Sequence, residues 1–574
     1  MVATAAYRPA PAGNPYAVSG HVFVVHGDLT HLACDDWLLP TDRELTLTDA
    51  WLPTLRDDAV RRGDDGVPRL AAAVSDSFCA GTRRVVAVPE EARAEPAEDS
   101  PVTRGRAWLL DIGDEQDVGV DWLVSGVREW LDACTAEASR SDRALPLLGL
   151  PLVGTGAGGA ATRRDEVLAE LLPALHEHAE RCGVDIALVL NDARDHAAAQ
   201  AVRARLQQGE DADCWDLDKS LLDAADELAA HATEGRLALF LGAGVSRAAG
   251  LPVWDELIGE LLDTAGVGAD ERAAVSRLEV PDQAEYVARR LPGGGDELRD
   301  WVRRRFAARP HALAHALLAA LPVRETVSTN WDPLFERAVR DTGRALPVIP
   351  YDDPAGSDRW LLKLHGDAHH GDGIVVRRSD YLRFAAEQNA LAGVVQSLLF
   401  TRHMLFVGFS LVDENFIRIA DDVTRLVDRY GGRAHEQREH SGTRRLGTTL
   451  ALHHDPAKPV LWPHLEHLVV TPAGGGEPPD QANAEAAAAQ ARRLEIFLDL
   501  LSARVDRGQL FLLDERYAGL LDEADRLLAE RLAGLAESAD ELSGSSSWPR
   551  VQALLSNLGD PSCVHMGTPP GDRA

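Results

Sequence analysis

The sequence predicts an α/β protein whose central region folds as a doubly wound parallel sheet, on three observations. Short apolar runs alternate with amphipathic helical patterns, as in proteins that cover both faces of a parallel sheet with helices. With 574 residues, the chain is too long for one ordinary core, so two or three domains are expected. A glycine-rich turn follows one apolar run, as at the ligand-binding edge of such sheets.

Two α/β domains and a helical end are expected along the chain. Residues 1–19, rich in Ala, Pro and Gly, are predicted to be disordered, and residues 20–205 to form the first α/β domain. Residues 206–475 form the second domain, residues 476–492 a flexible linker, and residues 493–574 a small helical appendage with a loose tail. The expected strands of the second domain are LALFL, VRETVSTN, WLLKLHGD, HMLFVGFS and LEHLVVTP.

Charge and cysteine content exclude several classes of protein. The formal net charge of -32 argues against nucleic acid as a direct substrate and against an anionic membrane as a partner. The six cysteines form no CxxC pair, so neither a disulfide framework nor a thiolate metal site is predicted. We find no secretory signal and no apolar run of about 18 residues, so a cytoplasmic protein is expected.

The glycine-rich turn lies in LALFLGAGVSRAAGLPVWDEL, residues 237–257. Gly242 and Gly244 follow a strand-like run, where glycine lets the backbone approach a phosphate at the start of a helix. A P-loop is excluded because no lysine follows Gly244 at the required spacing, and the third glycine comes too late for a dehydrogenase turn. On its own the turn would also fit a purely structural role.

Four motifs in order resemble those of the SIR2 (sirtuin) superfamily. GAGVSRAAGLPVW resembles its opening NAD-binding turn, STNWDPLFERAV its T-x-N-x-D segment, LLKLHGD its histidine strand end, and LFVGFSLVDENFIRIADDV its later G-x-S turn. The resemblance implies a Rossmann-like domain that holds NAD. The implied NAD contacts are Gly242, Ala243, Gly244, Ser246, Pro252, Trp254, Thr329, Gly408, Ser410, Asp413 and Asn415.

The same resemblance implies three catalytic residues, each with a structural alternative. Asn330 would position the nicotinamide ribose and water, or else cap the next helix. His365, which ends a strand, would act near the sugar hydroxyls or water, or else be a buried structural histidine. Asp332 precedes Pro333 and would face the nicotinamide carboxamide or cap the helix, and Asp413 also has a helix-cap alternative.

The missing cysteines decide which reaction the resemblance favours. Protein-deacylating sirtuins carry a four-cysteine zinc module after the histidine strand, whereas residues 366–407 contain no cysteine. The segment instead resembles zinc-free SIR2-like NADases of bacterial anti-phage systems. We therefore expect hydrolysis of NAD to nicotinamide and ADP-ribose without a metal, in an abortive-infection effector regulated by homo-oligomer packing or by an ATPase or other defence-system partner. The alternatives are an ADP-ribosyltransferase and a non-catalytic NAD or ADP-ribose sensor.

The first domain resembles a macro domain at two places. VVHGDLTHLACDDWLLPTD resembles the first macro motif, in which Asp28 would recognise adenine, although the asparagines that usually follow are absent. LPLLGLPLVGTGAGGAATRRDEV resembles the diphosphate loop. The implied ADP-ribose contacts are Asp28, Gly154, Thr155, Gly156, Gly158 and Gly159. The alternative is a scaffold that binds no nucleotide.

Overall fold

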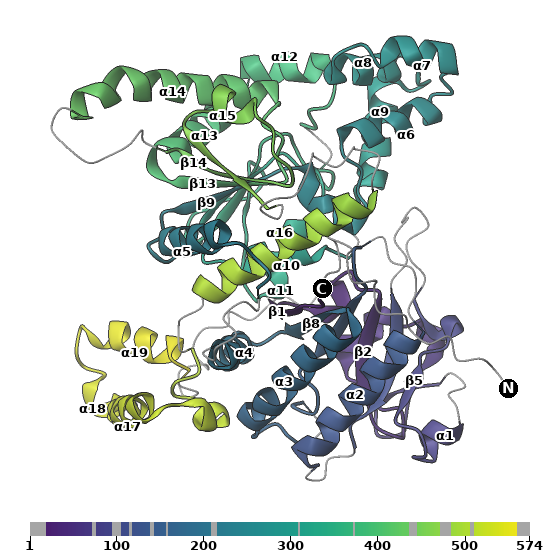
Figure 1. Ribbon diagram of the computed structural model, residues 1–574, viewed down its shortest axis with the longest axis vertical. Coiled ribbons are helices and arrows are strands. Elements are labelled where there is room, and N and C mark those ends of the chain that lie inside the picture. Colours follow the sequence, from purple (N-terminus) through teal and green to yellow (C-terminus); the bar gives the residue numbers. More distant parts are fainter. Residues whose placement is uncertain are drawn as a thin grey trace.

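A computed structural model shows two α/β domains, one above the other in Figure 1, with helix α16 (Ala484–Val505) between them. It describes residues 19–71, 76–94, 105–113, 118–137, 143–156, 159–207, 215–307, 310–370, 373–387, 389–435, 445–470, 484–505 and 510–559. The predicted disordered N-terminus, apart from Ser19, and the predicted loose tail beyond Gly559 lie outside these residues. No described helix is long and apolar enough to cross a membrane.

The N-terminal domain contains a six-stranded sheet in the order β1-β8-β7-β2-β6-β5. All neighbouring strands are parallel except β5 and β6. The strands are β1 (Val22–His26), β2 (Asp36–Thr41), β5 (Val85–Ala87), β6 (Arg106–Asp111), β7 (Leu147–Pro151) and β8 (Asp185–Leu190), and β3 (Val60–Arg62) and β4 (Pro68–Leu70) form a separate hairpin. Its helices are α1 (Asp76–Cys79), α2 (Val120–Ala136), α3 (Arg164–Cys182) and α4 (Ala193–Leu206).

The second domain contains a seven-stranded parallel sheet in the order β11-β12-β10-β9-β13-β14-β15, which confirms the predicted parallel sheet. The strands are β9 (Leu237–Leu241), β10 (Glu325–Ser328), β11 (Val348–Ile349), β12 (Trp360–Lys363), β13 (His403–Val407), β14 (Gly447–Ala451) and β15 (Leu465–Val469). After β9, the chain first adds β10 and β12 on one side of β9 in the sheet, and it later adds β13 on the other side. This reversal makes the carboxyl ends of β9 and β13 a topological switch point, where open α/β sheets bind ligands.

The helices of the second domain cover the sheet, and a group of them follows the turn after β9. They are α5 (Lys219–Thr233), α6 (Trp254–Thr264), α7 (Ala269–Val275), α8 (Val280–Arg290), α9 (Gly294–Arg305), α10 (Leu313–Ala320), α11 (Leu334–Asp341), α12 (Arg378–Glu387), α13 (Asn389–Thr401), α14 (Glu414–His435) and α15 (Lys458–Leu461). Helices α6 to α9 are inserted between β9 and β10 and share one apolar cluster with residues after β10 and β12, among them Trp331 and Val376.

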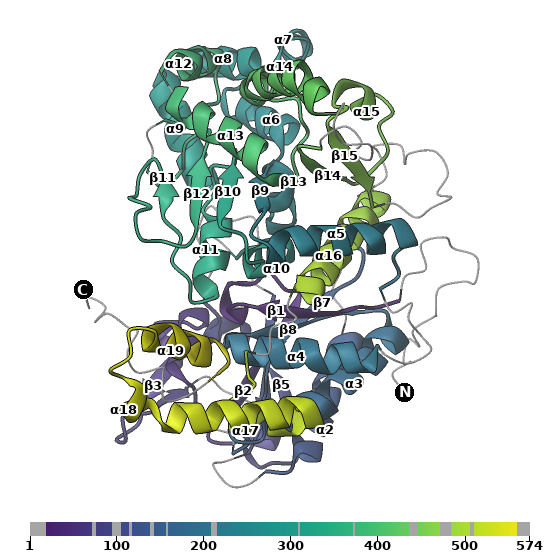
Figure 2. The same cartoon turned by 90° about the vertical axis from the view of Figure 1, so that its left-hand side faces the viewer.

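The two domains share an apolar core, which the sequence did not predict. Side chains alternate along β1, so Val22 and Val24 pack on the helices of the N-terminal domain, whereas Phe23 and Val25 face the second domain. Helices α5, α10 and α16 lie between the sheets in Figure 2 and complete that second cluster. The domains are therefore packed face to face rather than joined by a loose connection.

Helix α16 corrects two expectations. It begins at Ala484, inside the predicted linker 476–492, and it is part of the core rather than of a separate appendage. Arg492 forms a bidentate ion pair with Asp185 of β8, with nitrogen–oxygen distances of 2.7 to 3.0 Å. Asp499 accepts hydrogen bonds from Arg203 at 2.7 Å. These charges are buried on both sides of the contact, so they fix the helix in one position.

The remaining described C-terminal helices lie beside the N-terminal domain in Figures 1 and 2. They are α17 (Glu523–Glu537), α18 (Ala539–Leu542) and α19 (Trp548–Asn557), and they follow the short 3₁₀ helix η6 (Glu515–Leu520). The buried Tyr517 of η6 donates a hydrogen bond to Asp195 of α4 at 2.7 Å. The C-terminal region is helical, as predicted, and η6 and the preceding residues extend the core of the first domain.

Candidate active site

The predicted glycine turn lies at the switch point, where the ends of β9 and β13 touch. The amides of Gly242 and Gly244 donate to the carbonyls of Val407 and Gly408, both at 3.0 Å. A Cβ on Gly242 would lie 2.5 Å from the Gly408 oxygen, and Gly408 itself has a φ of +64°, which favours glycine. Both amides are therefore used within the protein, and the glycines are required by the close approach of two strand ends.

The helix after this turn differs from the predicted one. A short 3₁₀ helix, η5 (Ala243–Ala249), follows the turn, and the α-helical segment α6 begins only at Trp254. Ala243 and Gly244 remain accessible, whereas Pro252 is buried. The indole of Trp254 packs edge to face on that of Trp331, with ring centroids 5.3 Å apart, so Trp254 supports the loop after β10.

Asn330 follows β10, and the protein fixes its amide group from one side. Its Nδ2 donates to the Gly242 carbonyl at 3.1 Å and to Ser246 Oγ at 3.2 Å. Thr329, also a predicted NAD contact, instead joins β10 to β9, because its amide donates to the Leu241 carbonyl at 3.1 Å. The Asn330 Oδ1 atom is buried and has no hydrogen-bond partner among the described residues. Asn330 therefore offers one fixed acceptor.

Ser246, a predicted NAD contact, is buried and takes part in several hydrogen bonds. Its hydroxyl donates to Asp332 Oδ2 at 2.9 Å and lies 3.2 Å from His315 Nε2. The amide of Ala312 donates to His315 Nδ1, so the proton of this imidazole is on Nε2, directed at Ser246. Burial lowers the pKa of His315 to about 3, which keeps the ring neutral. Ser246 thus receives two hydrogen bonds, from His315 and Asn330, and gives one.

Both carboxylate oxygens of Asp332 are used by the protein. Oδ2 accepts from Ser246, and Oδ1 accepts from the amide of Leu334 at the start of α11, at 3.1 Å. The side chain is buried. This geometry favours the helix-cap alternative for Asp332 over direct contact with nicotinamide.

Lys363, which the sequence analysis did not select, anchors the loop that carries Asn330. Its Nζ lies 2.7 Å from Glu336 and 3.1 Å from Asp367, and it donates to the carbonyls of Asn330 and Asp332 at 3.2 and 2.5 Å. Burial by itself would lower the pKa of Lys363, but the surrounding carboxylates outweigh burial and raise it. The sequence feature that could have indicated this role is a charged side chain at the end of the apolar run WLLK.

His365 follows β12 and is buried, with a side chain 3% exposed. Its Nε2 lies 3.5 Å from Asp413 Oδ2 without the alignment of a hydrogen bond. Its backbone carbonyl accepts from Trp331 Nε1 at 3.1 Å, so the loop after β10 also fixes the histidine. The hydroxyl of Tyr381 in α12 donates to the same Asp413 oxygen at 2.9 Å.

The predicted contacts after β13 are divided between surface and interior. Ser410 is exposed, and its carbonyl accepts a hydrogen bond from Lys458 at 2.5 Å. Asn415 is buried, and its Nδ2 has no hydrogen-bond partner among the described residues. Asp413 caps α14 by accepting from the amide of Phe416 at 2.8 Å. One carboxylate oxygen of Asp413 therefore caps the helix, as the alternative role required, whereas the other oxygen faces His365.

The predicted ADP-ribose contacts of the first domain lie at one edge of its sheet. Asp28 follows β1 and the glycine loop follows β7, and β8 alone separates these strands. Thr155 is buried and its hydroxyl donates to the Leu152 carbonyl at 3.0 Å, so that hydroxyl is already used. Gly154, Gly156 and Gly159 are described, whereas Gly158 lies outside the described residues.

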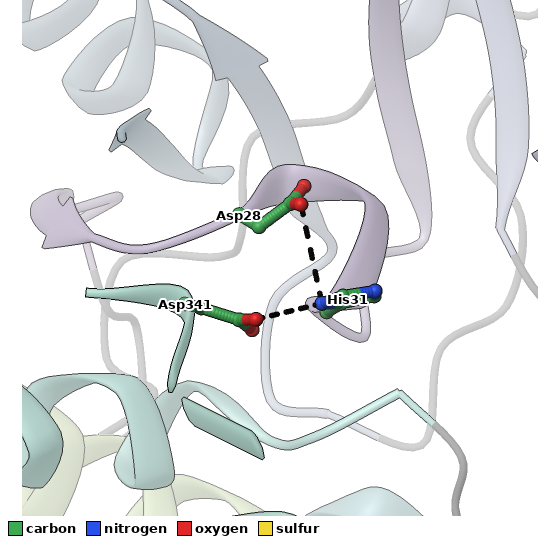
Figure 3. Close-up of side chains that lie close together, drawn as sticks. All are labelled: Asp28, His31 and Asp341. Atoms are coloured by element: carbon green, nitrogen blue, oxygen red, sulfur yellow. Dashed lines mark hydrogen bonds and ion pairs between the residues drawn. The ribbon is translucent and has the colours of Figure 1, made fainter. Parts of the chain in front are cut away.

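Asp28 also lies at the contact between the two domains. Figure 3 shows His31 between two carboxylates, with its Nδ1 2.8 Å from Asp341 of α11 and 4.0 Å from Asp28. One potential ligand atom from each of the three side chains lies within 4.8 Å of the other two, which is close enough to share a cation. Hydrogen bonds already engage both carboxylates, since Asp28 accepts from Thr30 and Asp341 lies 3.1 Å from His311. The cluster is thus accounted for as an interdomain contact.

Part of the second domain matches a known family. Residues 324–441, which contain Asn330, Lys363, His365 and Asp413, match the SIR2-like domain family. The chain is 25% identical over 219 residues to the defense-associated sirtuin 2 of Bacillus subtilis, a match covering 37% of this chain and 21% of that protein. It is 29% and 24% identical to the NAD(+) hydrolases ThsA of Enterococcus faecium, over 209 residues, and of Bacillus cereus strain MSX-D12, over 213 residues. These matches cover 35% and 36% of this chain.

The matched segment spans about a fifth of the sirtuin and 42% of each hydrolase. The resemblance of the N-terminal domain to a macro domain stays a prediction. The parallel sheet, the ordered motifs and these matches agree: the chain carries a SIR2-like domain, similar in sequence to a defence-associated sirtuin and to NAD(+) hydrolases.

Proposed function

We propose that the SIR2-like domain hydrolyses NAD to nicotinamide and ADP-ribose. The observation that carries the proposal is two buried polar atoms without hydrogen-bond partners among the described residues, Asn330 Oδ1 and Asn415 Nδ2, at the sheet edge where the His365 imidazole also lies. These residues follow β10, β13 and β12, which lie within a run of four adjacent strands. Buried polar groups are almost always paired in folded proteins, so these two atoms point to a polar ligand.

Each catalytic residue has a role that suits this reaction. The Asn330 amide is held by Gly242 and Ser246, so its oxygen accepts a hydrogen bond from a ribose hydroxyl or from the attacking water. His365 takes the proton of that water, because a neutral imidazole has one ring nitrogen that accepts a proton. Nicotinamide is a good leaving group, so holding the ribose and excluding bulk water account for much of the required catalysis.

The relatives favour hydrolysis in a defence setting. Two are named NAD(+) hydrolases and one a defense-associated sirtuin. We propose a cytoplasmic anti-phage effector that depletes NAD, requires no metal, and is restrained by a homo-oligomer or a defence-system partner. Such restraint fits an enzyme that would otherwise consume the NAD of its own cell.

For the N-terminal domain we propose binding of an ADP-ribose-type nucleotide at Asp28 and the loop of Gly154, Thr155, Gly156, Gly158 and Gly159. Both segments lie at the carboxyl edge of one sheet, where ligands of such sheets bind. Isothermal titration of the full chain with ADP-ribose should detect a site that Asp28→Ala removes and His365→Ala retains. Equal binding by wild type and Asp28→Ala would contradict this assignment.

Incubation of the purified full chain with NAD tests the proposed reaction. Wild type should release nicotinamide and free ADP-ribose, and Asn330→Ala and His365→Ala should each lose activity while remaining folded. His369→Ala, at an exposed histidine nearby in sequence, is the matched control. Transfer of label from NAD to protein would favour an ADP-ribosyltransferase, and NAD binding without turnover at several protein concentrations would favour a sensor.

A further inference from the structure

Asp413 contacts more than a helix cap requires. Its Oδ1 accepts from the amide of Phe416 at 2.8 Å, and this bond alone satisfies the start of α14. Its Oδ2 accepts from Tyr381 at 2.9 Å and lies 3.5 Å from His365 Nε2. Capping explains the first oxygen, whereas the second accepts from Tyr381 and also faces a buried histidine.

The environment keeps this second oxygen negatively charged. Burial would raise the pKa of Asp413, but the charge of His365 and the hydrogen bonds from Phe416 and Tyr381 lower it below the usual value. The side chains of Asp413 and His365 are only 10% and 3% exposed, so water does not screen the pair. A carboxylate at this distance favours an imidazole whose proton is on the facing nitrogen.

The ring of His365 is also fixed from other directions. Tyr381 and Phe384 pack edge to face against it, with ring centroids 5.7 and 6.1 Å away. The structure records no hydrogen bond to its Nδ1 among the described residues. With Nε2 facing Asp413, Nδ1 is the nitrogen left for a substrate or water.

We infer that Asp413, itself oriented by Tyr381, is the positioning residue of His365, holding the imidazole proton on Nε2 so that Nδ1 accepts a proton. This inference rests on the proposed NAD hydrolysis. Water gives its proton to Nδ1 while its oxygen bonds to C1′ of the ribose. The bond from C1′ to nicotinamide breaks, and its electron pair leaves with nicotinamide. The proton then passes from His365 to solvent.

This role differs from the NAD contact that the sequence resemblance implied for Asp413. A contact to NAD would act on NAD binding, whereas a positioning residue acts on the chemical step. The pair is at the long end of hydrogen-bonding distance, as is common at catalytic contacts before substrate binds. The two roles therefore predict different kinetic constants.

The test uses Asp413→Asn and Tyr381→Phe in the full chain. Asparagine caps helices as well as aspartate does, so α14 keeps its start while His365 loses the negative charge. Asp218→Asn is the matched control, because Asp218 caps α5 of the same domain through the amide of Leu221. Release of nicotinamide at varied NAD concentration gives kcat and KM, and the melting temperature reports folding.

We expect Asp413→Asn to lower kcat by about 10²-fold or more, with KM changed less than about threefold. Tyr381→Phe should lower kcat by about tenfold, since it removes one hydrogen bond to the carboxylate. Asp218→Asn should match wild type. A raised KM with unchanged kcat would assign Asp413 to NAD binding, and unchanged constants would leave it a helix cap; either result overturns the inference.

A second measurement separates this inference from the proposed function. Nitrogen NMR of the chain labelled with ¹⁵N-histidine, with His365 assigned from the spectrum of His365→Ala, reports which ring nitrogen carries the proton. The inference requires the proton on Nε2 in wild type and loss of this preference in Asp413→Asn. A wild-type proton on Nδ1 would overturn it. If wild type releases no nicotinamide, the proposed function fails and the NMR result alone decides the role of Asp413.

Discussion

Replacing Lys363 by methionine should destabilise the SIR2-like domain and inactivate its site. Methionine has nearly the same volume, so the change removes the charge without leaving a large cavity. Glu336 and Asp367 would then be buried without their cation, and the carbonyls of Asn330 and Asp332 would lose a donor. Removing one partner of a buried ion pair costs about 3–5 kcal/mol.

That cost should be visible as a shift in melting temperature. At about 2–4 °C per kcal/mol for a domain of this size, the midpoint should fall by about 6–20 °C. Differential scanning calorimetry of wild type and Lys363→Met measures the shift, and adding Glu336→Gln to the variant should restore part of it. A midpoint within about 2 °C of wild type would refute the view that Lys363 anchors this loop.

The pH dependence of the same variant gives an independent check. Burial already raises the pKa of Glu336, and loss of Lys363 should raise it further. The folded variant then holds a proton that the unfolded chain releases near pH 4, so its stability should decrease as pH rises above this value. The difference in melting temperature between wild type and Lys363→Met should therefore be larger at pH 8 than at pH 5.

Three further substitutions test other contacts. Ser246→Ala should destabilise the fold by about 1–3 kcal/mol and lower kcat, because it removes one of the two hydrogen bonds that hold the Asn330 amide; thermal melts and nicotinamide release measure both effects. Asp341→Asn should weaken the interdomain contact at pH 7. Burial would raise the pKa of Asp341, but hydrogen bonds from histidines lower it to about 2. In urea unfolding, wild type should therefore be more stable than Asp341→Asn above about pH 4, and this difference should disappear as the pH falls toward 2. Arg492→Met should cost about 3–5 kcal/mol by urea unfolding, whereas Arg504→Met, in the last turn of the same helix, should cost less than about 1 kcal/mol. Equal effects of the two arginine changes would argue against α16 as part of the core.

Much of the SIR2-like domain was predictable because its signals are local. Most strands contain a short apolar run; Gly242 directly follows its strand, and Asn330 and His365 each lie two residues after theirs. Parallel strands bring their carboxyl ends to one edge, so position along the chain was enough to group these residues. The glycine turn was also recognisable, although its glycines serve the approach of β9 and β13.

The remaining contacts depend on pairings distant in sequence. Ser246 meets His315 and Asp332, which are 69 and 86 residues further along the chain, and no local pattern indicates such partners. Helix α16 was divided between a linker and an appendage because its first half, rich in alanine, has the composition of a low-complexity segment. Its buried partners, Asp185 and Arg203, show that the middle of the helix belongs to the core.

The most direct test of the central claim is the balance of products when the full chain is mixed with NAD. Wild type should release nicotinamide and free ADP-ribose in equal amounts, with no label on protein, and Asn330→Ala should release neither while melting near the wild-type temperature. Undiminished release by a folded Asn330→Ala variant, or nicotinamide release without free ADP-ribose, would contradict the assignment of this site as an NAD hydrolase.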